Sequence, residues 1–417
     1  MKTAIFKTTL LAVFICLSGC VQKNNKMSKT AAEIIGNPEY LAISYGGYRT
    51  NSRNVQPTIK ELKDDVKILA AMGIKILRTY NVQLQQAPNL LKAIKELKQE
   101  DSSFEMYVML GAWIDCKNAW TGLPVDHDIE SENNASEIDR AVALAKQYPN
   151  IVKVIAVGNE AMVKWAESYY VQPEVILKWV NHLQTLKKSG ILSKDLWITS
   201  SDDFSSWGGG DTSYHNADLE KLIKAVDYVS MHTYPFHNTH YNPQFWETPE
   251  EQQLLTSIEQ TNVAMLRAKD FAINQYTAVK NYVNSLGVDK PIHIGETGWA
   301  SISNEHYGEH GSRAADEYKQ GLYYQHIREW TKANNIACFY FEAFDENWKD
   351  AANPEGSENH FGLINLKNEA KFPIWNLVEK GAFKNLQRNE KPITKTFNGD
   401  QEELLKGILS PNVEYQK

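Results

Sequence analysis

The chain has 417 residues and a formal net charge of −7, long enough for one large domain or two small ones. The mildly acidic balance, without a run of basic residues, argues against a nucleic-acid partner. Aromatic residues make up 11% of the chain, with 11 Trp and 20 Tyr. This content suits a protein that stacks against flat rings, although protein cores also use Trp and Tyr.

The first residues have the pattern of an export signal. Lys2 and Lys7 precede an apolar run at residues 10–17, which is too short to span a membrane as a helix. Residues 17–20, Leu-Ser-Gly-Cys, resemble a bacterial lipobox, in which Cys20 is acylated and becomes the mature N-terminus. An ordinary secretory signal with an incidental cysteine is the alternative. The pattern predicts an exported protein anchored by lipid to a bacterial membrane, with the outer membrane expected and the periplasmic or cell-surface side left open.

Strand and helix patterns then alternate along most of the chain. Eight such units predict parallel βαβ connections that close into a single (β/α)8 TIM barrel of the α/β class. An open doubly wound sheet would place a glycine-rich phosphate loop after the first strand, and residues 44–48, Ser-Tyr-Gly-Gly-Tyr, are not one. The predicted strands cover residues 42–48, 74–81, 105–113, 154–162, 196–202, 228–236, 292–301 and 336–348.

Composition divides the chain into four parts. They are a signal peptide at 1–19, a flexible tether at 20–37, the barrel at 38–385 and a polar C-terminal tail at 386–417. 

Cys116 and Cys338 are the cysteines left to the mature domain, and they are predicted at opposite ends of strands. Because a strand of about seven residues spans about 20 Å, we expect no disulfide between them. No His/Cys spacing indicates zinc, and neither a metal nor a cofactor is expected.

Two predicted strands end in a carboxylate. One ends in Gly158-Asn159-Glu160, and the other ends in Glu296, which Thr297, Gly298 and Trp299 follow. The carboxyl ends of barrel strands form the active-site face, where a sheltered carboxylate must be paired or hydrogen-bonded. Two carboxylates there are the minimum equipment for cleaving a glycosidic bond, and Trp299 offers a platform for a sugar ring. The structural alternative is a glutamate that caps a helix and a tryptophan that fills the core.

Other strand ends carry polar and aromatic side chains. Arg78 and Tyr80 share one face of the second strand, because residues two apart point the same way. His232 ends the sixth predicted strand, and Asp345 and Lys349 lie at the end of the eighth. These residues also have structural alternatives. Arg78 could form a structural ion pair, Asp345 and Lys349 could pair with each other on the surface, and His232 could be a polar residue with its hydrogen bonds satisfied. Seven tryptophans fall at or just after strand ends, a bias that a long sugar-binding cleft would explain: Trp113, Trp120, Trp165, Trp207, Trp246, Trp299 and Trp348.

Three motifs resemble those of glycoside hydrolase family 17. Residues 155–160 are similar to its acid/base motif, residues 295–301 to its nucleophile motif and residues 341–349 to its eighth strand, and Arg78-Thr79-Tyr80 fits its second strand. The resemblance covers about residues 42–380. It implies a (β/α)8 barrel, retaining chemistry and β-1,3-glucan substrates.

The same resemblance implies roles for single residues. Glu160 would be the acid/base and Glu296 the nucleophile, and Asn159 would bind the 2-hydroxyl of the cleaved sugar. Tyr234 would lie near the nucleophile, and Glu346 and Lys349 near the acid/base. Arg78, Tyr80, Trp299 and Trp348 complete the expected substrate-binding set. The departures are Ala300, where proline is usual, and long loops at 114–135 and 235–262.

We therefore expect a monomeric, exported endo-β-1,3-glucanase acting on laminarin-type polysaccharides or oligosaccharides. A glucanosyltransferase would use the same covalent intermediate and pass the sugar to another glucan. A non-catalytic surface glycan-binding lipoprotein is a third alternative, but such a protein would be expected to lose one of the two carboxylates, and both are present.

Overall fold

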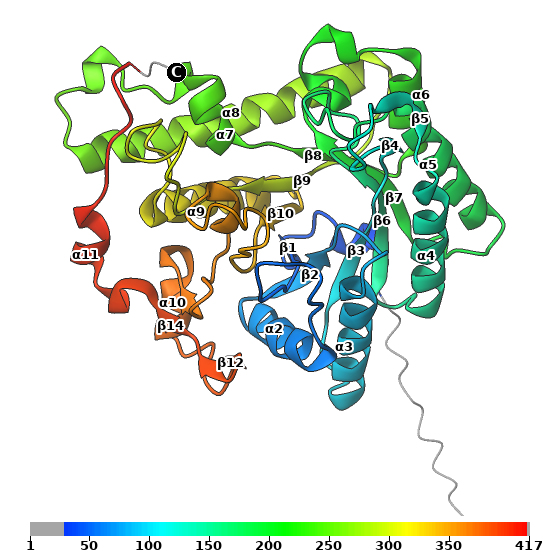
Figure 1. The fold of residues 1–417 in the computed structure, drawn as a ribbon, viewed down its shortest axis with the longest axis horizontal. Helices are drawn as coiled ribbons and strands as arrows, with labels where there is room; N and C mark the ends of the chain where they lie inside the picture. Colours follow the sequence, from blue (N-terminus) through cyan, green and yellow to red (C-terminus); the bar gives the residue numbers. More distant parts are fainter. Residues whose placement is uncertain (1–28, 415–417) are drawn as a thin grey trace, which may run out of the picture.

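The computed structural model describes residues 29–414. Eight parallel strands close into a barrel in the order β1-β10-β9-β8-β7-β6-β3-β2, and helices cover its outside (Figure 1). The prediction of a single (β/α)8 barrel is confirmed. The barrel strands are β1 Leu41–Ser44, β2 Ile74–Arg78, β3 Tyr107–Ala112, β6 Val152–Asn159, β7 Trp197–Asp203, β8 Val229–His232, β9 Ile292–Gly298 and β10 Cys338–Phe341. The helices that follow them are α2 Ile59–Ala71, α3 Gln86–Glu100, α4 Asn133–Gln147, α5 Pro173–Lys188, α6 Ala217–Ala225, α8 Ser257–Ser285, α9 Glu317–Ala333 and α10 Trp375–Glu379.

The strands are buried on both faces, as expected where helices cover a parallel sheet. Every residue of β3 and β9 is buried, and so is nearly every residue of β6. The predicted strands start close to the observed ones, but all except the fifth run too far at their carboxyl ends: β10 stops at Phe341, well before residue 348. The apolar and aromatic residues beyond these ends line a cleft or pack under loops, and the sequence pattern does not distinguish these settings from a strand.

A short helix, α1 Ala31–Ile34, closes the amino end of the barrel. Thr30 and Glu33 form a capping box at its start, in which each side chain accepts a hydrogen bond from the other's backbone N–H. Ile34 and Ile35 are buried among residues at the amino ends of the strands, including Ala42 and Phe339. The predicted flexible tether at 20–37 is therefore wrong for its last part, because these apolar side chains complete the barrel core.

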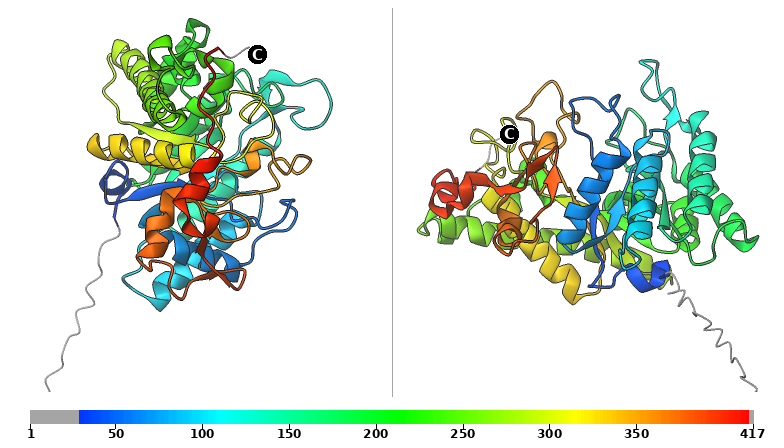
Figure 2. Two further views of the ribbon diagram at one scale, coloured as in Figure 1. Left: turned by 90° about the vertical axis from the view of Figure 1, so that its left-hand side faces the viewer. Right: turned by 90° about the horizontal axis from the view of Figure 1, so that it is seen from below.

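Two long insertions rise from the carboxyl ends of the strands. The first contains a hairpin made of β4 Cys116–Lys117 and β5 Asp126–Glu130, which projects beyond the barrel rim in cyan in both views of Figure 2. The second contains α7 Pro235–Tyr241 and two short 3-10 turns before α8. Both fall where long loops were expected.

The predicted C-terminal tail packs along one side of the barrel (Figure 1). It contains α11 Gln401–Lys406 and the short strands β12 Gln387–Arg388, β13 Lys391–Pro392 and β14 Thr394–Lys395, the last paired with β11 Glu369–Ala370. Arg388 is buried and donates a hydrogen bond to Asp65 of α2 at 3.0 Å. The backbone N–H of Thr248 donates to the carbonyl of Asn412 at 2.8 Å. These contacts make the segment a structural part of the domain.

Cys116 and Cys338 are both buried and free, which confirms the prediction that they do not pair. The predicted signal peptide and Cys20 lie outside the described residues. Across residues 29–414, no helix is long and apolar enough to cross a membrane.

Candidate active site

Glu160 follows the end of β6 in an unusual backbone conformation. Gly158 has φ of +82° and Glu160 has φ of +47°, and the register between β6 and β7 shifts just before them. A left-handed residue other than glycine costs roughly 1–2 kcal/mol and persists where the surroundings hold it, often at functional sites. Here the backbone N–H of Glu160 donates to the carbonyl of Ser201 at 2.9 Å. The turn is thereby fixed beside the end of β7.

Glu296 lies within β9, and two strand-end side chains hold its carboxylate. A guanidinium nitrogen of Arg78 bonds to Oε1, and the hydroxyl of Tyr234 donates to Oε2 at 2.8 Å. Arg78 also donates to Oδ1 of Asn159 at 2.6 Å, and its guanidinium lies over the ring of Tyr80, 4.8 Å from the centroid. The structure thus brings together five residues that the sequence indicated for the site. Arg78 does form an ion pair, and its partner is Glu296, another residue of the predicted site.

His232 lies between the two carboxylates. Its Nδ1 is 3.0 Å from Oε1 of Glu160 and 3.7 Å from Oε2 of Glu296, and its Nε2 is 2.8 Å from Oγ of Ser201. One carboxylate oxygen of Glu160 and one of Glu296 lie within 4.8 Å of each other. His232 on its own in the sequence favours an ordinary hydrogen-bonded polar residue, and the structure instead places it in the site. Its spacing of two from Tyr234, which puts both on one face of the strand, was the signal that could have found it.

The two carboxyl groups sit in opposite electrostatic environments. Burial raises the pKa of Glu160 well above its usual range, and the negative charge of Glu296 adds to this effect. Burial also acts to raise the pKa of Glu296, but the charge of Arg78 and the hydrogen bond from Tyr234 outweigh it, so that pKa is lowered. Burial lowers the pKa of His232 to about 4, which leaves this imidazole neutral near pH 7. The surroundings therefore favour the neutral form of Glu160 and the ionised form of Glu296.

The same three side chains could geometrically hold a metal ion. Arg78 already neutralises Glu296, and burial raises the pKa of Glu160 and so favours its neutral form, which weakens the negative charge that would attract a cation. The arrangement fits proton transfer and nucleophilic attack better than metal binding.

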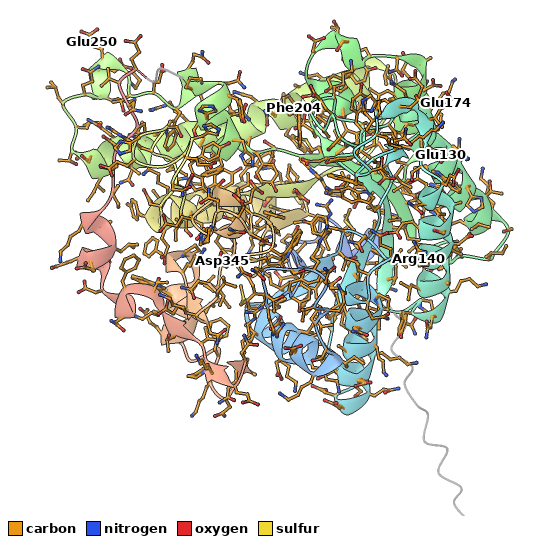
Figure 3. All side chains as sticks on the ribbon, viewed as in Figure 1. Glu130, Arg140, Glu174, Phe204, Glu250 and Asp345 are labelled. Carbon is orange, nitrogen blue, oxygen red and sulfur yellow. The ribbon has the colours of Figure 1, made fainter. Side chains whose placement is uncertain are left out.

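The carboxylates open into a cleft of about 1420 Å³. In Figure 3, Asp345 marks the β10 side of the molecule, and Arg140 and Glu130 mark the side of α4 and the hairpin, well apart from it. Side chains from both sides contribute to the lining, which includes Tyr48, Tyr80, Trp113, Trp120, Asn159, Trp165, Tyr169, Phe204, Phe341, Trp348, Lys349 and Phe361.

The β10 side of the cleft is a network of charges. Glu346 accepts hydrogen bonds from the backbone N–H of Tyr48 at 2.9 Å and from Nε1 of Trp348 at 3.0 Å. Gly46 lies against this carboxylate, where any larger side chain would collide with it. Lys349 is paired with Glu342, with Glu346 3.7 Å away. The sequence analysis did not place Glu342 in the site.

The outcome for the expected positions of Glu346 and Lys349 is mixed. Both line the cleft, but their close partners are each other, Glu342, Tyr48 and Trp348. No contact with Glu160 is found among the described residues. The surface pair expected as an alternative for Asp345 and Lys349 is wrong: Asp345 is buried and pairs with Lys371 at 2.7 Å.

The strand-end tryptophans divide into two groups. Trp113, Trp120, Trp165 and Trp348 line the cleft, as expected. Trp207, Trp246 and Trp299 are fully buried and donate their Nε1–H groups to backbone carbonyls. The prediction that Trp299 contacts a sugar is therefore wrong. Its ring packs against Phe236, Trp246 and Tyr323 behind the cleft wall, a setting that position at a strand end does not reveal.

Residues 42–362 match the family model described as the BtgE/BtgC glycoside hydrolase domain. The chain belongs to this family. A relative from Aspergillus terreus, named as a probable glucan endo-1,3-beta-glucosidase, is 24% identical over 380 residues, which cover 85% of the present chain and 50% of that relative. The chain thus spans about half the length of that protein.

Solved structures give the same family picture. An endo-laminarinase from Formosa Hel1_33_131 is 64% identical with a TM-score of 0.92, and the match covers 93% of the present chain and 99% of that one. A mutant β-1,3-glucanosyltransferase from Rhizomucor miehei, in complex with laminaritriose, is 20% identical with a TM-score of 0.55, covering 80% and 96% of the two chains. The second likeness shows the barrel fold alone.

Proposed function

We propose that this glycoside hydrolase cleaves β-1,3-glucan chains of the laminarin type internally, with retention of anomeric configuration. The observation that carries the proposal is the pair Glu160 and Glu296, whose oxygens approach within 4.8 Å and whose pKa values are shifted in opposite directions. Retaining glycosidases hold their carboxyl groups about 5–5.5 Å apart, whereas inverting enzymes need roughly 6.5–9.5 Å to admit a water. The substrate class is that of the endo-laminarinase relative, and the motifs shared with glycoside hydrolase family 17 agree with it.

In the first step the ionised Glu296 attacks the anomeric carbon while Glu160 protonates the leaving glycosidic oxygen. Arg78 and Tyr234 keep Glu296 ionised and fix its orientation. In the second step Glu160, now ionised, takes a proton from water, which then displaces the sugar from Glu296. Asn159, held by Arg78, is placed to bind the 2-hydroxyl of the reacting sugar.

The remaining predicted site residues have supporting roles in this proposal. Tyr80 supports Arg78, and Trp348 presents its ring to a bound sugar. Glu346 and Lys349 complete the polar wall on the β10 side. If another glucan replaced water in the second step, the same site would act as a glucanosyltransferase.

The test combines two variants with product analysis on linear β-1,3-glucan. Glu160→Gln and Glu296→Gln each remove one half of the mechanism, so turnover should fall by about 10³-fold or more while the domain stays folded. Glu174→Gln, the same change at an exposed position of α5 that does not line the cleft, is the matched control. Circular dichroism checks folding, and mass spectrometry separates hydrolysis from transfer.

Proton NMR of the first products should show the β-anomer before mutarotation. An α-anomer would make Glu296 a base rather than a nucleophile, and near-normal turnover of either folded variant would remove that residue from the mechanism. A chelator such as EDTA should leave turnover unchanged.

We further propose that Cys20 carries a lipid that anchors the mature protein to a bacterial membrane. The support is the Leu-Ser-Gly-Cys sequence at residues 17–20 after a short apolar run. Cys20→Ser should move the exported protein from the membrane fraction to the soluble fraction, with Cys116→Ser as the control. A native protein that is already soluble and has no added lipid mass would contradict the anchor.

A further inference from the structure

The cleft continues from Glu160 to a group of aromatic rings at the ends of β3 and β6. Trp113, Trp120 and Tyr169 form this group, which we call the hairpin platform. The ring centroids of Trp120 and Tyr169 are 5.1 Å apart with planes 23° apart, and those of Trp113 and Tyr169 are 5.2 Å apart. All three rings line the same cleft as the two carboxylates. The platform is therefore an extension of the active site rather than a separate patch.

Trp120 presents a large apolar surface to solvent. It is 64% exposed, and the hairpin that carries it is held by antiparallel pairing of β4 with β5. An exposed aromatic face beside a cleft commonly marks a place where a ligand is bound. The flat C–H face of a pyranose ring is the part of a glucan that such a surface would cover.

The platform is held in place before any ligand arrives. The backbone N–H of Cys116 in β4 donates to the carbonyl of Tyr169 at 3.1 Å. In β5, the ring of His127 stacks on Tyr170 with centroids 3.6 Å apart, and the His127 carbonyl accepts from the N–H of Gln172 at 3.3 Å. These contacts fasten the hairpin to the loop that follows Glu160. A preformed surface loses little conformational entropy when it binds.

A polar group lies at the edge of the platform. Asp115 is 7% exposed and lines the cleft, and its Oδ2 accepts a hydrogen bond from Nε1 of Trp113 at 3.3 Å. Its Oδ1 is buried and makes no hydrogen bond of normal geometry among residues 29–414; burial raises the pKa of this carboxyl, and the nearby Ser131, Trp113 and Trp120 side chains partly oppose that rise. A buried acceptor without such a bond is costly, and a sugar hydroxyl would satisfy it. An aromatic face with a polar acceptor at its rim matches the two kinds of surface on a glucose ring.

We infer that the hairpin platform is a distal binding site for the leaving part of the glucan chain. The general acid protonates the oxygen that leaves with this part. Glu160 directly follows β6, which neighbours β3 in the barrel, and the platform residues lie in the loops that follow these same two strands. Glu296 and Trp348 lie instead on the side of β9 and β10. The inference rests on the proposed function and deepens it: the insertion at 114–135 makes the enzyme prefer long chains.

The experiment compares Trp120→Ala with the wild type on substrates of different length. On laminarihexaose and laminarin, kcat/KM should fall about tenfold, the change expected for losing contact with roughly 55 Å² of apolar sugar surface. On 4-nitrophenyl laminaribioside, whose leaving group is not a sugar, the change should stay under about twofold. In a Glu296→Gln background, calorimetry should show about tenfold weaker binding of laminarihexaose when Trp120 is replaced.

Two further variants make the result specific. Trp120→Phe keeps a ring and should restore most of the long-chain activity. Leu123→Ala changes a 60% exposed side chain on the same hairpin that does not line the cleft, and kcat/KM should stay unchanged on both the long and the short substrate.

Three outcomes would overturn the inference while leaving the proposed function intact: unchanged long-chain activity in Trp120→Ala, equal losses on both substrates, or an equal loss in Leu123→Ala. A wild-type protein inactive on every β-1,3-glucan would overturn the function and the inference with it.

Discussion

Arg78 makes the two active-site carboxyl groups chemically different. Its guanidinium pairs with Glu296, and burial of this ion pair strengthens the interaction by removing the screening effect of water. Glu160 gains no comparable partner, and its strongest neighbouring charge is the negative one of Glu296. In the proposed mechanism, one buried cation therefore sets which carboxyl group attacks and which donates a proton.

Removing this cation should change the pH dependence of the reaction. Arg78 lowers the pKa of Glu296, which must be ionised to attack, so activity is lost as the pH falls through that pKa. In Arg78→Met the pKa rises, and the acidic limb of kcat/KM against pH should move to higher pH with at least a 10²-fold loss of activity.

Arg78→Lys is the control for that experiment, because it keeps the charge and should keep the acidic limb near its original position. It also controls for loss of folding in Arg78→Met, because removing one partner of a buried ion pair lowers the free energy of unfolding by about 3–5 kcal/mol. An acidic limb that stays in place in folded Arg78→Met would show that another group keeps Glu296 ionised.

Two tryptophans should respond in opposite ways to truncation. Trp299→Ala removes a fully buried ring and should lower the free energy of unfolding by about 3–5 kcal/mol. Trp348→Ala removes a cleft-lining ring and should lower kcat/KM about tenfold, with a stability change of roughly 1 kcal/mol or less. Urea unfolding and steady-state kinetics measure the two effects. If Trp299→Ala were stable but inactive, the expectation of a sugar contact would return.

At the scale of single residues, the sequence revealed the two carboxylates at the ends of predicted strands and missed residues whose role depends on their surroundings. Glu160 and Glu296 were found because a carboxylate at a strand end is chemically costly. His232 and Glu342 were missed because their importance depends on which side chain lies opposite, and sequence spacing does not report this. Trp299 was misassigned for the same reason.

Among the elements, the C-terminal segment joins most directly to the cleft wall. Asp65 of α2 accepts hydrogen bonds from Arg388 at 3.0 Å, from Arg49 at 2.8 Å and from the hydroxyl of Tyr45 at 2.9 Å. Tyr45 in turn lines the cleft. A segment distant in sequence thus supports a side chain of the site.

Arg388→Ala should therefore destabilise the domain. The variant removes one of two cations from the fully buried Asp65, so we expect a loss of about 2 kcal/mol in the free energy of unfolding, measured by urea titration. Lys391→Ala, at an exposed position of the same segment, should stay within about 0.5 kcal/mol of the wild type. Equal stability of both variants would show that the tail does not support the barrel.

At the scale of the elements, the alternation of strand patterns with helix patterns predicted the eight barrel strands. Each βα unit must bury its strand on both faces, so each strand leaves an apolar run in the sequence. The two insertions were located as long loops, but the hairpin within the first was not foreseen. Its strands carry polar residues such as Asp126 and Lys117, and tertiary contacts with the loop after Glu160 hold them. Helix α1 was read as tether because one buried turn is too short to leave a periodic pattern.

In the whole molecule, the sequence order of eight units decides the topology, and the closed barrel brings distant residues together. Arg78 and Glu296 are separated by 218 positions in the chain. Closure of the sheet alone predicts that their strand ends share one face. The distances between them, and the pKa shifts that follow, depend on side-chain packing that only the structure supplies.

The small helix α1 packs against the amino ends of the barrel strands, whereas the cleft opens at their carboxyl ends. In the right-hand view of Figure 2, α1 lies at the edge of the molecule away from the hairpin of β4 and β5. A solid support coupled at residue 29 would therefore be attached at the end of the barrel opposite the cleft. An enzyme fixed to a bead through this end should have its cleft facing the solution and keep its full kcat/KM on dissolved polymers. Fixing it through a cysteine introduced at Leu123, on the rim, should obstruct long polymers and spare short ones. The fold thus allows attachment at the amino end of the barrel while the cleft at the carboxyl end stays accessible to substrate.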